Sequence, residues 1–240
     1  MSGESLKATE TLKNLRGAIF DLDGTLLDSM PIWDAAGINY LKGKGILPKK
    51  DLREKLRPLS ITEAAGYLRT EYCISDDIAL IIDGINKTTE DAYFFNAPLK
   101  SGIYELLKLF AERGVKMCIA TATDRYLVEA ALKRNGISDF FEAVLTCSEL
   151  KTSKRNSADI YLKGLEVIGT NIHDTFVFED ALYAVKTAKK SGFKVVGVYD
   201  ESASPYAAEV AKLSDIFIRS WHDLTKYKAF LSLSNTHYRD

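Results

Sequence analysis

Several side chains that could bind a cation or move a phosphoryl group follow short apolar runs. Residues 17–30 read GAIFDLDGTLLDSM, so Asp21 and Asp23 come directly after a run that is typical of a buried strand. Side chains two residues apart lie on the same side of an extended chain, so we expect these carboxylates to converge. They would repel each other unless a cation or a proton intervened. Because Asp-Gly is also a common turn dipeptide, this stretch alone does not establish a site.

Two later apolar runs end in similar groups. VKMCIA is followed by TATD, which supplies the Thr121 hydroxyl and backbone amides where the chain turns into a helix, a usual place for an anion. TFVF is followed by Glu179 and Asp180. In an open α/β sheet, ligands bind beyond the carboxyl ends of the strands. We therefore expect these side chains to meet Asp21 and Asp23 at one sheet edge.

A basic loop, KTSKRNSAD, lies just before a helical pattern and brings three cations to the same edge, namely Lys151, Lys154 and Arg155. The carboxylates suit a hard cation such as Mg²⁺, which prefers a few oxygen ligands together with water and a phosphate. A hydroxyl and a lysine suit phosphate oxygens. Each group alone could be a helix cap or a solvated loop residue, but together they predict a site for phosphoryl transfer.

The elements that must position these groups are strands alternating with helices. After residue 100, the apolar runs VKMCIA, EAVLT, TFVFE, KVVGVY and DIFI are separated by helical patterns that end at glycines. This alternation predicts an α/β fold, a Rossmann-like parallel sheet with helices on both faces.

Residues 31–98 follow a different pattern. They contain helical segments such as IWDAAGINYLKGKG and ITEAAGYLRTEY without a comparable strand run, and Pro31 and Pro98 lie near the two ends. We interpret this region as an inserted all-helical cap domain joined by two short linkers that form a hinge. The α/β core then comprises residues 1–30 and 99–240.

Composition limits the classes of partner. The 240 residues are 46% hydrophobic, which is enough for a full core, and 32 basic residues nearly balance 33 acidic ones. No long block of one sign indicates nucleic-acid or membrane binding. The three cysteines are widely spaced, and no apolar stretch has the length of a signal peptide or a membrane span. We expect a cytoplasmic monomer acting on a small molecule.

The motifs resemble, in order, those of the haloacid dehalogenase superfamily of aspartate-nucleophile phosphotransferases. DLDGT, the IAT that ends the second strand, a lysine before a helix, and FED at the end of a strand carry the resemblance, which covers nearly the whole chain. The stretch TFVFEDALYAVKTAKKSGFKVVGVYD is similar to the β-phosphoglucomutase-like and phosphatase branch with a small helical cap. The resemblance implies a Mg²⁺-dependent phosphatase of a small phosphorylated metabolite.

The resemblance also implies a role for each site residue. Asp21 would be the nucleophile that forms an aspartyl-phosphate, and Asp23 would protonate the leaving oxygen and then take a proton from the hydrolytic water. Mg²⁺ would be held by Asp21, the backbone carbonyl of Asp23 and Asp180, with Glu179 orienting a bound water or a second group. The oxygens of the phosphate would be held by Thr121, Lys154 and the amides near Leu22 and Ala122.

The lysine departs from the pattern of most relatives. In those relatives it lies four residues before the aspartate of the D-I-F/Y helix start, but Arg155 occupies that distance from Asp159 here. Lys154 is one residue further away. We choose Lys154 because a loop absorbs one extra residue easily and a lysine delivers a compact ammonium, and Lys151 and Arg155 stay open.

Three alternatives differ in mechanism. A hexose-phosphate mutase would have a histidine in the early cap, where DSMPIWD has Trp33, so we favour the phosphatase. A halide-releasing dehalogenase needs neither Mg²⁺ nor a second acid, and Asp23 and Asp180 argue against it. A non-catalytic metabolite-binding protein could keep the same fold, although the complete set of motifs argues against this. The sequence does not identify the phosphate ester.

Overall fold

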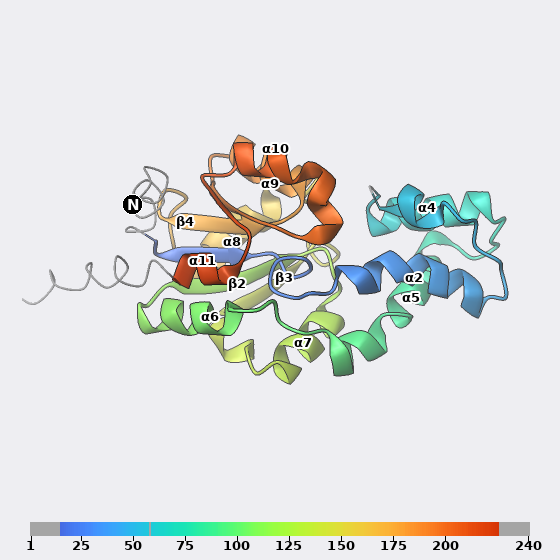
Figure 1. The fold of residues 1–240 in the computed structure, drawn as a ribbon, viewed down its shortest axis with the longest axis horizontal. Helices are drawn as coiled ribbons and strands as arrows, with labels where there is room; N and C mark the ends of the chain where they lie inside the picture. Colours follow the sequence, from blue (N-terminus) through green and yellow to red (C-terminus); the bar gives the residue numbers. More distant parts are fainter. Residues whose placement is uncertain (1–14, 58, 226–240) are drawn as a thin grey trace, which may run out of the picture. The chain divides into compact units, whose positions relative to one another are not determined.

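The computed structural model describes residues 15–57 and 59–225 (Figure 1). Its centre is a sheet of six strands in the order β3-β2-β1-β4-β5-β6, and every neighbouring pair is parallel. The strands are β1 (Gly17–Phe20), β2 (Lys116–Thr121), β3 (Ala143–Thr146), β4 (Thr175–Glu179), β5 (Lys194–Val198) and β6 (Ile216–Ile218). The predicted α/β class with a Rossmann-like parallel sheet is confirmed.

Helices cover both faces of this sheet, with α6 and α7 on one face and α9 and α10 on the other (Figure 1). On one face, Ile19 of β1 packs in a buried cluster with Tyr161 and Val185. On the opposite face, Phe20 stacks on Phe178 with a distance of 4.4 Å between ring centroids. The helices are α6 (Ile103–Glu112), α7 (Arg125–Arg134), α8 (Asp159–Ile168), α9 (Leu182–Lys190), α10 (Ala207–Leu213) and α11 (Trp221–Thr225), with short 3₁₀ turns η2 (Ser138–Phe140) and η3 (Glu201–Tyr206). Strand β1 is therefore buried on both faces, which explains its unbroken apolar run.

Residues 29–97 form a second compact unit with its own core. It contains α2 (Met30–Gly43), α3 (Leu52–Leu56), α4 (Ile61–Glu71), α5 (Ile78–Lys87) and a π-helical turn, η1 (Ala92–Asn96), and its described residues include no strand. The described residues 15–28 and 98–225 belong to the first compact unit. These borders lie one or two residues from the expected 30/31 and 98/99. Helix α2 begins at Met30 and Pro31 lies in its first turn, where proline is well tolerated.

The two connections between the units run beside each other where they leave the sheet unit. Leu27 and Leu99 form an antiparallel bridge. The Asp28 amide donates to the Pro98 carbonyl at 2.9 Å, and the Lys100 amide donates to the Leu26 carbonyl at 2.9 Å. The segment that follows Asp21 and Asp23 is thus hydrogen-bonded to the segment that returns from residues 29–97.

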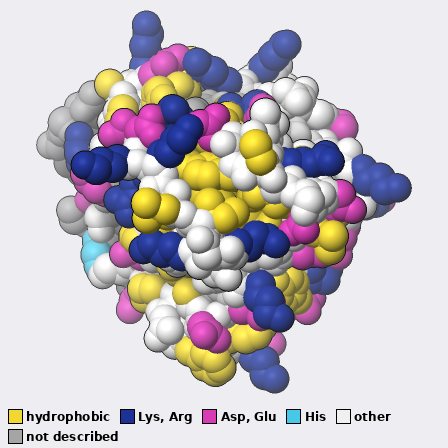
Figure 2. Space-filling view, turned by 90° about the vertical axis from the view of Figure 1, so that its right-hand side faces the viewer, with side chains coloured by type: hydrophobic (Ala, Val, Ile, Leu, Met, Phe, Trp, Pro, Cys, Tyr) yellow, Lys and Arg dark blue, Asp and Glu magenta, His cyan; other side chains and the backbone are white. Residues whose placement is uncertain are grey.

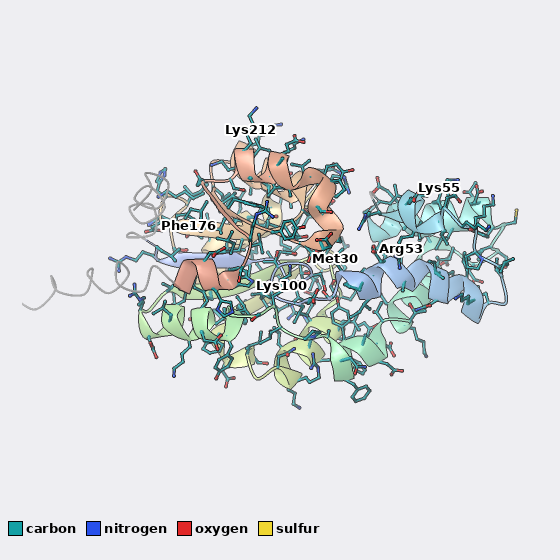
Figure 3. All side chains as sticks on the ribbon, in the orientation of Figure 1. Met30, Arg53, Lys55, Lys100, Phe176 and Lys212 are labelled. Atoms are coloured by element: carbon teal, nitrogen blue, oxygen red, sulfur yellow. The ribbon has the colours of Figure 1, made fainter. Side chains whose placement is uncertain are left out.

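Charged side chains of both signs are mixed on the surface. Figure 2 shows Lys and Arg beside Asp and Glu over one face. On α3, labelled through Arg53 and Lys55 in Figure 3, the Lys55 ammonium lies 2.9 Å from Asp51. Within the part of the chain that the structure describes, no helix has both the length and the apolar character that a membrane span requires.

Candidate active site

Three buried carboxylates gather where β1 and β4 end. Asp21, Glu179 and Asp180 each offer an oxygen, and these oxygens all lie within 4.8 Å of one another. The strand register explains this meeting, because Phe20 pairs with Phe178 and the Asp21 amide donates to the Phe178 carbonyl at 3.0 Å. We call these three side chains the carboxylate cluster.

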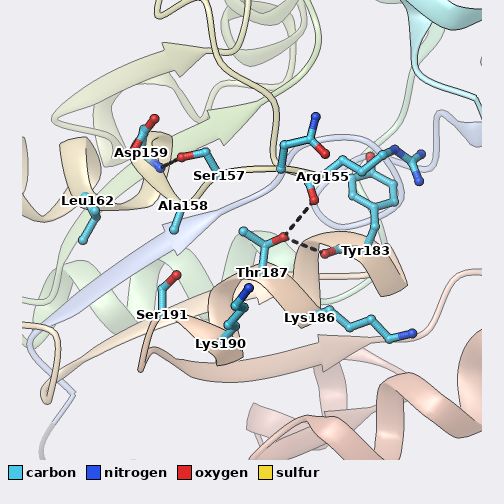
Figure 4. A pocket seen from close by; sticks show the side chains of 11 residues that line it. Arg155, Ser157, Ala158, Asp159, Leu162, Tyr183, Lys186, Thr187, Lys190 and Ser191 are labelled. Atoms are coloured by element: carbon cyan, nitrogen blue, oxygen red, sulfur yellow. Dashed lines mark hydrogen bonds between the residues drawn. The ribbon is translucent and has the colours of Figure 1, made fainter.

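Lys154 is the basic loop residue that contacts the carboxylate cluster. Its ammonium donates to Asp21 Oδ1 and, at 2.6 Å, to Glu179 Oε1, and only 4% of the residue is exposed. Lys151 is exposed and has a φ of 51°. Arg155 lies 4.2 Å above the Tyr183 ring, beside a pocket of about 560 Å³ between the start of α8 and α9 (Figure 4). Of the three basic side chains that the sequence left open, the structure brings Lys154 to Asp21.

Burial dominates the electrostatics of the carboxylate cluster. Burial raises the pKa of Asp21 well above its usual range, the charge of Glu179 raises it further, and Lys154 opposes both. Burial likewise raises the pKa of Asp180 to about 7, with Glu179 adding to the shift. Burial alone would lower the pKa of Lys154, but the charges of Asp21 and Glu179 outweigh it and raise that pKa, so the side chain stays an ammonium.

The carboxylate cluster fits a divalent cation. Glu179 Oε1 accepts hydrogen bonds from Lys154 and, at 2.8 Å, from the Tyr161 hydroxyl, whereas its Oε2 atom is buried and has no hydrogen-bond partner. A buried carboxylate oxygen without a partner is costly unless something positive lies beside it. The donors are all hard oxygens, which suit Mg²⁺. Asp21, Glu179 and Asp180 are therefore the residues that would hold it.

The Gly24-Thr25 turn packs directly against Asp180. The Thr25 hydroxyl donates to Asp180 Oδ1 at 3.1 Å, and the Trp221 indole donates to the Thr25 carbonyl at 3.0 Å. Gly24 has a φ of +80°, and a Cβ atom added to it would lie 2.5 Å from Asp180 Oδ2. The turn thus needs glycine for its backbone conformation and for its close approach to the carboxylate.

We expect Gly24→Ala to damage cation binding more than folding. The added methyl group should displace the Asp180 carboxylate and weaken Mg²⁺ binding at least about tenfold, a change measurable by titration calorimetry. Gly114→Ala is the matched control, because Gly114 has a similar φ of +69° but no atom within 4 Å of the added Cβ. Equal losses of Mg²⁺ affinity in both variants would show that backbone strain, and not the contact with Asp180, is responsible.

Asp23 is not one of the three carboxylates whose oxygens all lie within 4.8 Å of one another, but its charge is among the causes that raise the pKa of Asp21. Strand β1 ends at Phe20, so Asp23 lies in the turn that follows the strand. Its Oδ2 atom accepts a hydrogen bond from the Thr123 hydroxyl at 2.6 Å. The Asp23 carboxylate is half-buried, which suits a group that exchanges protons with a substrate or water.

Besides Lys154, the groups predicted to hold phosphate lie at the ends of β1 and β2. Thr121 is the last residue of β2 and is buried, and its hydroxyl oxygen accepts the Thr123 amide at 3.1 Å. Ala122 follows in the exposed turn before α7. Leu22 is buried, and its carbonyl accepts the amides of Leu26 and Leu27. The register that pairs Phe20 with Ile119 places Thr121 one residue beyond the position opposite Asp21.

Sequence reasoning missed three partners of the site residues. Thr25 bonds Asp180, Thr123 bonds Asp23, and Tyr161 bonds Glu179. All three lie inside stretches that the sequence singles out, namely DLDGT, TATD and the D-I-F/Y helix start. Membership of these motifs was the only indication in the sequence that the three residues belong to the site. The partners of Thr25 and Thr123 are more than 90 positions away in the sequence.

Comparison with known proteins places this site in a family. Residues 18–198 match the haloacid dehalogenase-like hydrolase family. The chain is 25% identical over 187 residues to a phosphorylated carbohydrates phosphatase of Thermotoga maritima, covering 77% of this chain and 85% of that protein. It is 24% identical over 225 residues to hexitol phosphatase B of Escherichia coli, covering 90% and 96%.

Solved structures share the fold. A haloacid dehalogenase hydrolase from Entamoeba histolytica superposes with a TM-score of 0.77 at 17% identity, covering 92% of this chain and 100% of that chain. CbbY from Rhodobacter sphaeroides, solved with xylulose-(1,5)bisphosphate, superposes with a TM-score of 0.74 at 20% identity, covering 88% and 96%. The family match spans most of the sheet unit and all of residues 29–97. The chain therefore belongs to the haloacid dehalogenase-like hydrolase family.

Proposed function

We propose that this phosphoric monoester hydrolase releases phosphate from a small phosphorylated metabolite through an aspartyl-phosphate on Asp21, with Mg²⁺ as cofactor. The observation that carries the proposal is the carboxylate cluster with Lys154 at the carboxyl ends of two adjacent parallel strands. The names of the two relatives, a phosphatase of phosphorylated carbohydrates and a hexitol phosphatase, support a sugar or sugar-alcohol phosphate as the first substrate to test.

Phosphoryl transfer begins at Asp21. One carboxylate oxygen attacks phosphorus, a new oxygen–phosphorus bond forms, and the bond to the leaving oxygen breaks. Asp23 donates a proton to that oxygen, so the product leaves as a neutral alcohol. The hydrogen bond from Thr123 supports this role, because it holds the Asp23 carboxyl group in one orientation.

Hydrolysis completes the cycle. Asp23, now ionised, takes a proton from water, and the resulting hydroxide attacks phosphorus, so that Asp21 is released with inorganic phosphate. Lys154 and Thr121 hold phosphate oxygens while charge moves between attacking and leaving atoms. When bound, Mg²⁺ would neutralise charge on the carboxylates and on the phosphoryl oxygens.

The environment of Trp33 supports hydrolysis over mutase chemistry. Its indole nitrogen donates to the Tyr93 hydroxyl at 2.7 Å, and the two rings meet edge to face with centroids 6.1 Å apart. An indole neither ionises nor takes up a proton near neutral pH, so Trp33 cannot replace the histidine that mutase relatives have there. The proposed cap therefore lacks, at this position, the group that a mutase would use.

The deciding experiment incubates the protein with a sugar 1-phosphate and Mg²⁺ and follows two products. We expect stoichiometric free phosphate and no isomerised sugar phosphate. Dialysis against EDTA should abolish phosphate release, and Mg²⁺ should restore it. Mg²⁺ should also raise the melting temperature, because a ligand that binds only the folded chain stabilises it by about 2.7 kcal/mol at a hundredfold excess over Kd. Isomerised product without phosphate would instead establish the mutase.

A further inference from the structure

A second lysine–carboxylate pair, with a buried carboxylate and a half-buried lysine, lies at the same edge of the sheet. The Lys100 ammonium donates to Asp200 Oδ2 at 2.7 Å and to the Tyr199 carbonyl at 3.0 Å, and Lys100 is labelled in Figure 3. Only 5% of the Asp200 side chain and 16% of the Lys100 side chain are exposed. Asp200 Oδ1 also accepts the Ser202 amide at 2.8 Å and the Ser202 hydroxyl at 2.5 Å. Both oxygens of the Asp200 carboxylate therefore accept hydrogen bonds, and one of the donors is the Lys100 ammonium.

Strand register places this pair beside Asp180. Glu179 of β4 pairs with Gly197 of β5, Asp180 directly follows β4, and Asp200 lies two residues beyond the end of the neighbouring β5. The Asp200 carboxylate therefore adds negative charge at the sheet edge that holds the carboxylate cluster, and the Lys100 ammonium paired with it compensates for that charge.

Lys100 also belongs to the segment that is paired with the Asp23 loop. Its amide donates to the Leu26 carbonyl, and the preceding residue, Leu99, bridges to Leu27. Its side chain reaches across to the end of β5. One residue thus connects the returning linker, the loop that follows Asp23 and the strand next to β4.

We propose that Lys100 is a positioning residue that compensates the negative charge of Asp200. This compensation sets how strongly this sheet edge binds a cation and how strongly it binds a phosphate anion. Within the described sheet edge, Lys154 is already shared by Asp21 and Glu179, so Lys100 is the cation that compensates Asp200. The part of this inference that concerns phosphate rests on the proposed function, whereas the part that concerns the cation does not.

The test is a double-mutant cycle with Lys100→Met, Asp200→Asn and both changes together, measured on the full chain. Mg²⁺ affinity comes from titration calorimetry, and KM comes from phosphate release. Lys100→Met leaves an extra negative charge, so we expect the Kd for Mg²⁺ to fall and KM to rise, each about three- to tenfold. Asp200→Asn leaves an extra positive charge and should shift both values in the opposite direction. The double variant should return close to the original values.

Two further variants test whether the effect depends on the charge of Lys100 and on its position. Lys100→Arg keeps the charge and should keep both constants, which also tests the proposal if Lys100→Met does not fold. Lys116→Met is the matched control, because Lys116 makes a similar pair with Glu142 at 2.6 Å in an exposed position at the start of β2. It should leave Mg²⁺ affinity unchanged.

The outcomes separate this inference from the proposed function. Shifts of Kd in the same direction in both single variants, or no shift in either, would overturn the electrostatic role and leave a structural pair. A chain that binds Mg²⁺ but releases no phosphate from any ester would refute the phosphatase proposal, while opposite shifts of Kd would still support the role of Lys100.

Discussion

Replacing Asp21 with asparagine should lower kcat for phosphate release at least about 1,000-fold. The amide is nearly the same size as the carboxylate, and its oxygen can still accept the hydrogen bond that Lys154 donates to Asp21 Oδ1. It cannot act as an anionic nucleophile, so no aspartyl-phosphate forms. We therefore expect the variant to fold normally and to fail at the first chemical step, with little change in the binding of substrate.

Acid quenching followed by mass spectrometry measures this step directly. The unmodified chain should carry one phosphoryl group on the peptide that contains Asp21 during turnover, and Asp21→Asn should carry none. Asp28→Asn is the matched control: it makes the same chemical change at an exposed position of the same segment and should leave turnover unchanged. A phosphorylated peptide in Asp21→Asn would assign the nucleophile to a different residue.

The parallel sheet could be predicted because strands that are buried on both faces have unbroken runs of apolar residues. Each apolar run from GAIF to DIFI became a strand, and the carboxyl ends of neighbouring strands necessarily meet at one edge. That rule brings Asp21 and Asp180 together without any knowledge of side-chain contacts. It does not give the side-chain partner of Asp23, since the strand ends three residues earlier and Asp23 accepts a hydrogen bond from Thr123, which follows β2.

Contacts between distant side chains could not be predicted. Lys100 and Asp200 are separated by 100 positions, and neither stands in a recognisable motif. The basic loop is a different case: its spacing points to Arg155, whereas the chemistry of a compact ammonium pointed to Lys154, and the structure brings Lys154 to Asp21 and Arg155 to Tyr183. Residue type therefore predicted this contact where spacing did not.

Replacing Lys154 with methionine should have the second large effect, on both activity and stability. Methionine fills much of the same space but leaves Asp21 and Glu179 buried together without their shared ammonium. Removing one partner of a buried ion pair costs about 3–5 kcal/mol in the free energy of unfolding, which urea denaturation at pH 7 measures. Losing a donor to the phosphoryl oxygens should also reduce kcat/KM at least about 100-fold.

The dependence of this instability on pH identifies its cause. Without Lys154, the pKa of Asp21, already raised by burial and by Glu179, should rise further in the folded chain. A carboxyl group with a raised folded pKa favours folding below its unfolded pKa, about 4, and loses that contribution as the pH rises through the folded value. The deficit of Lys154→Met should therefore be smallest near pH 4 and grow toward pH 8.

A matched control separates this charge effect from lost packing. Lys163 forms an exposed pair with Glu166 at 2.7 Å on α8, and Lys163→Met should change stability little at any pH. An equal deficit of Lys154→Met at pH 4 and pH 8 would mean that packing around the aliphatic part of the side chain, and not the two carboxylates, accounts for the loss. A deficit that grows with pH would mean that Lys154 favours the ionised form of Asp21, which is the form that attacks phosphorus.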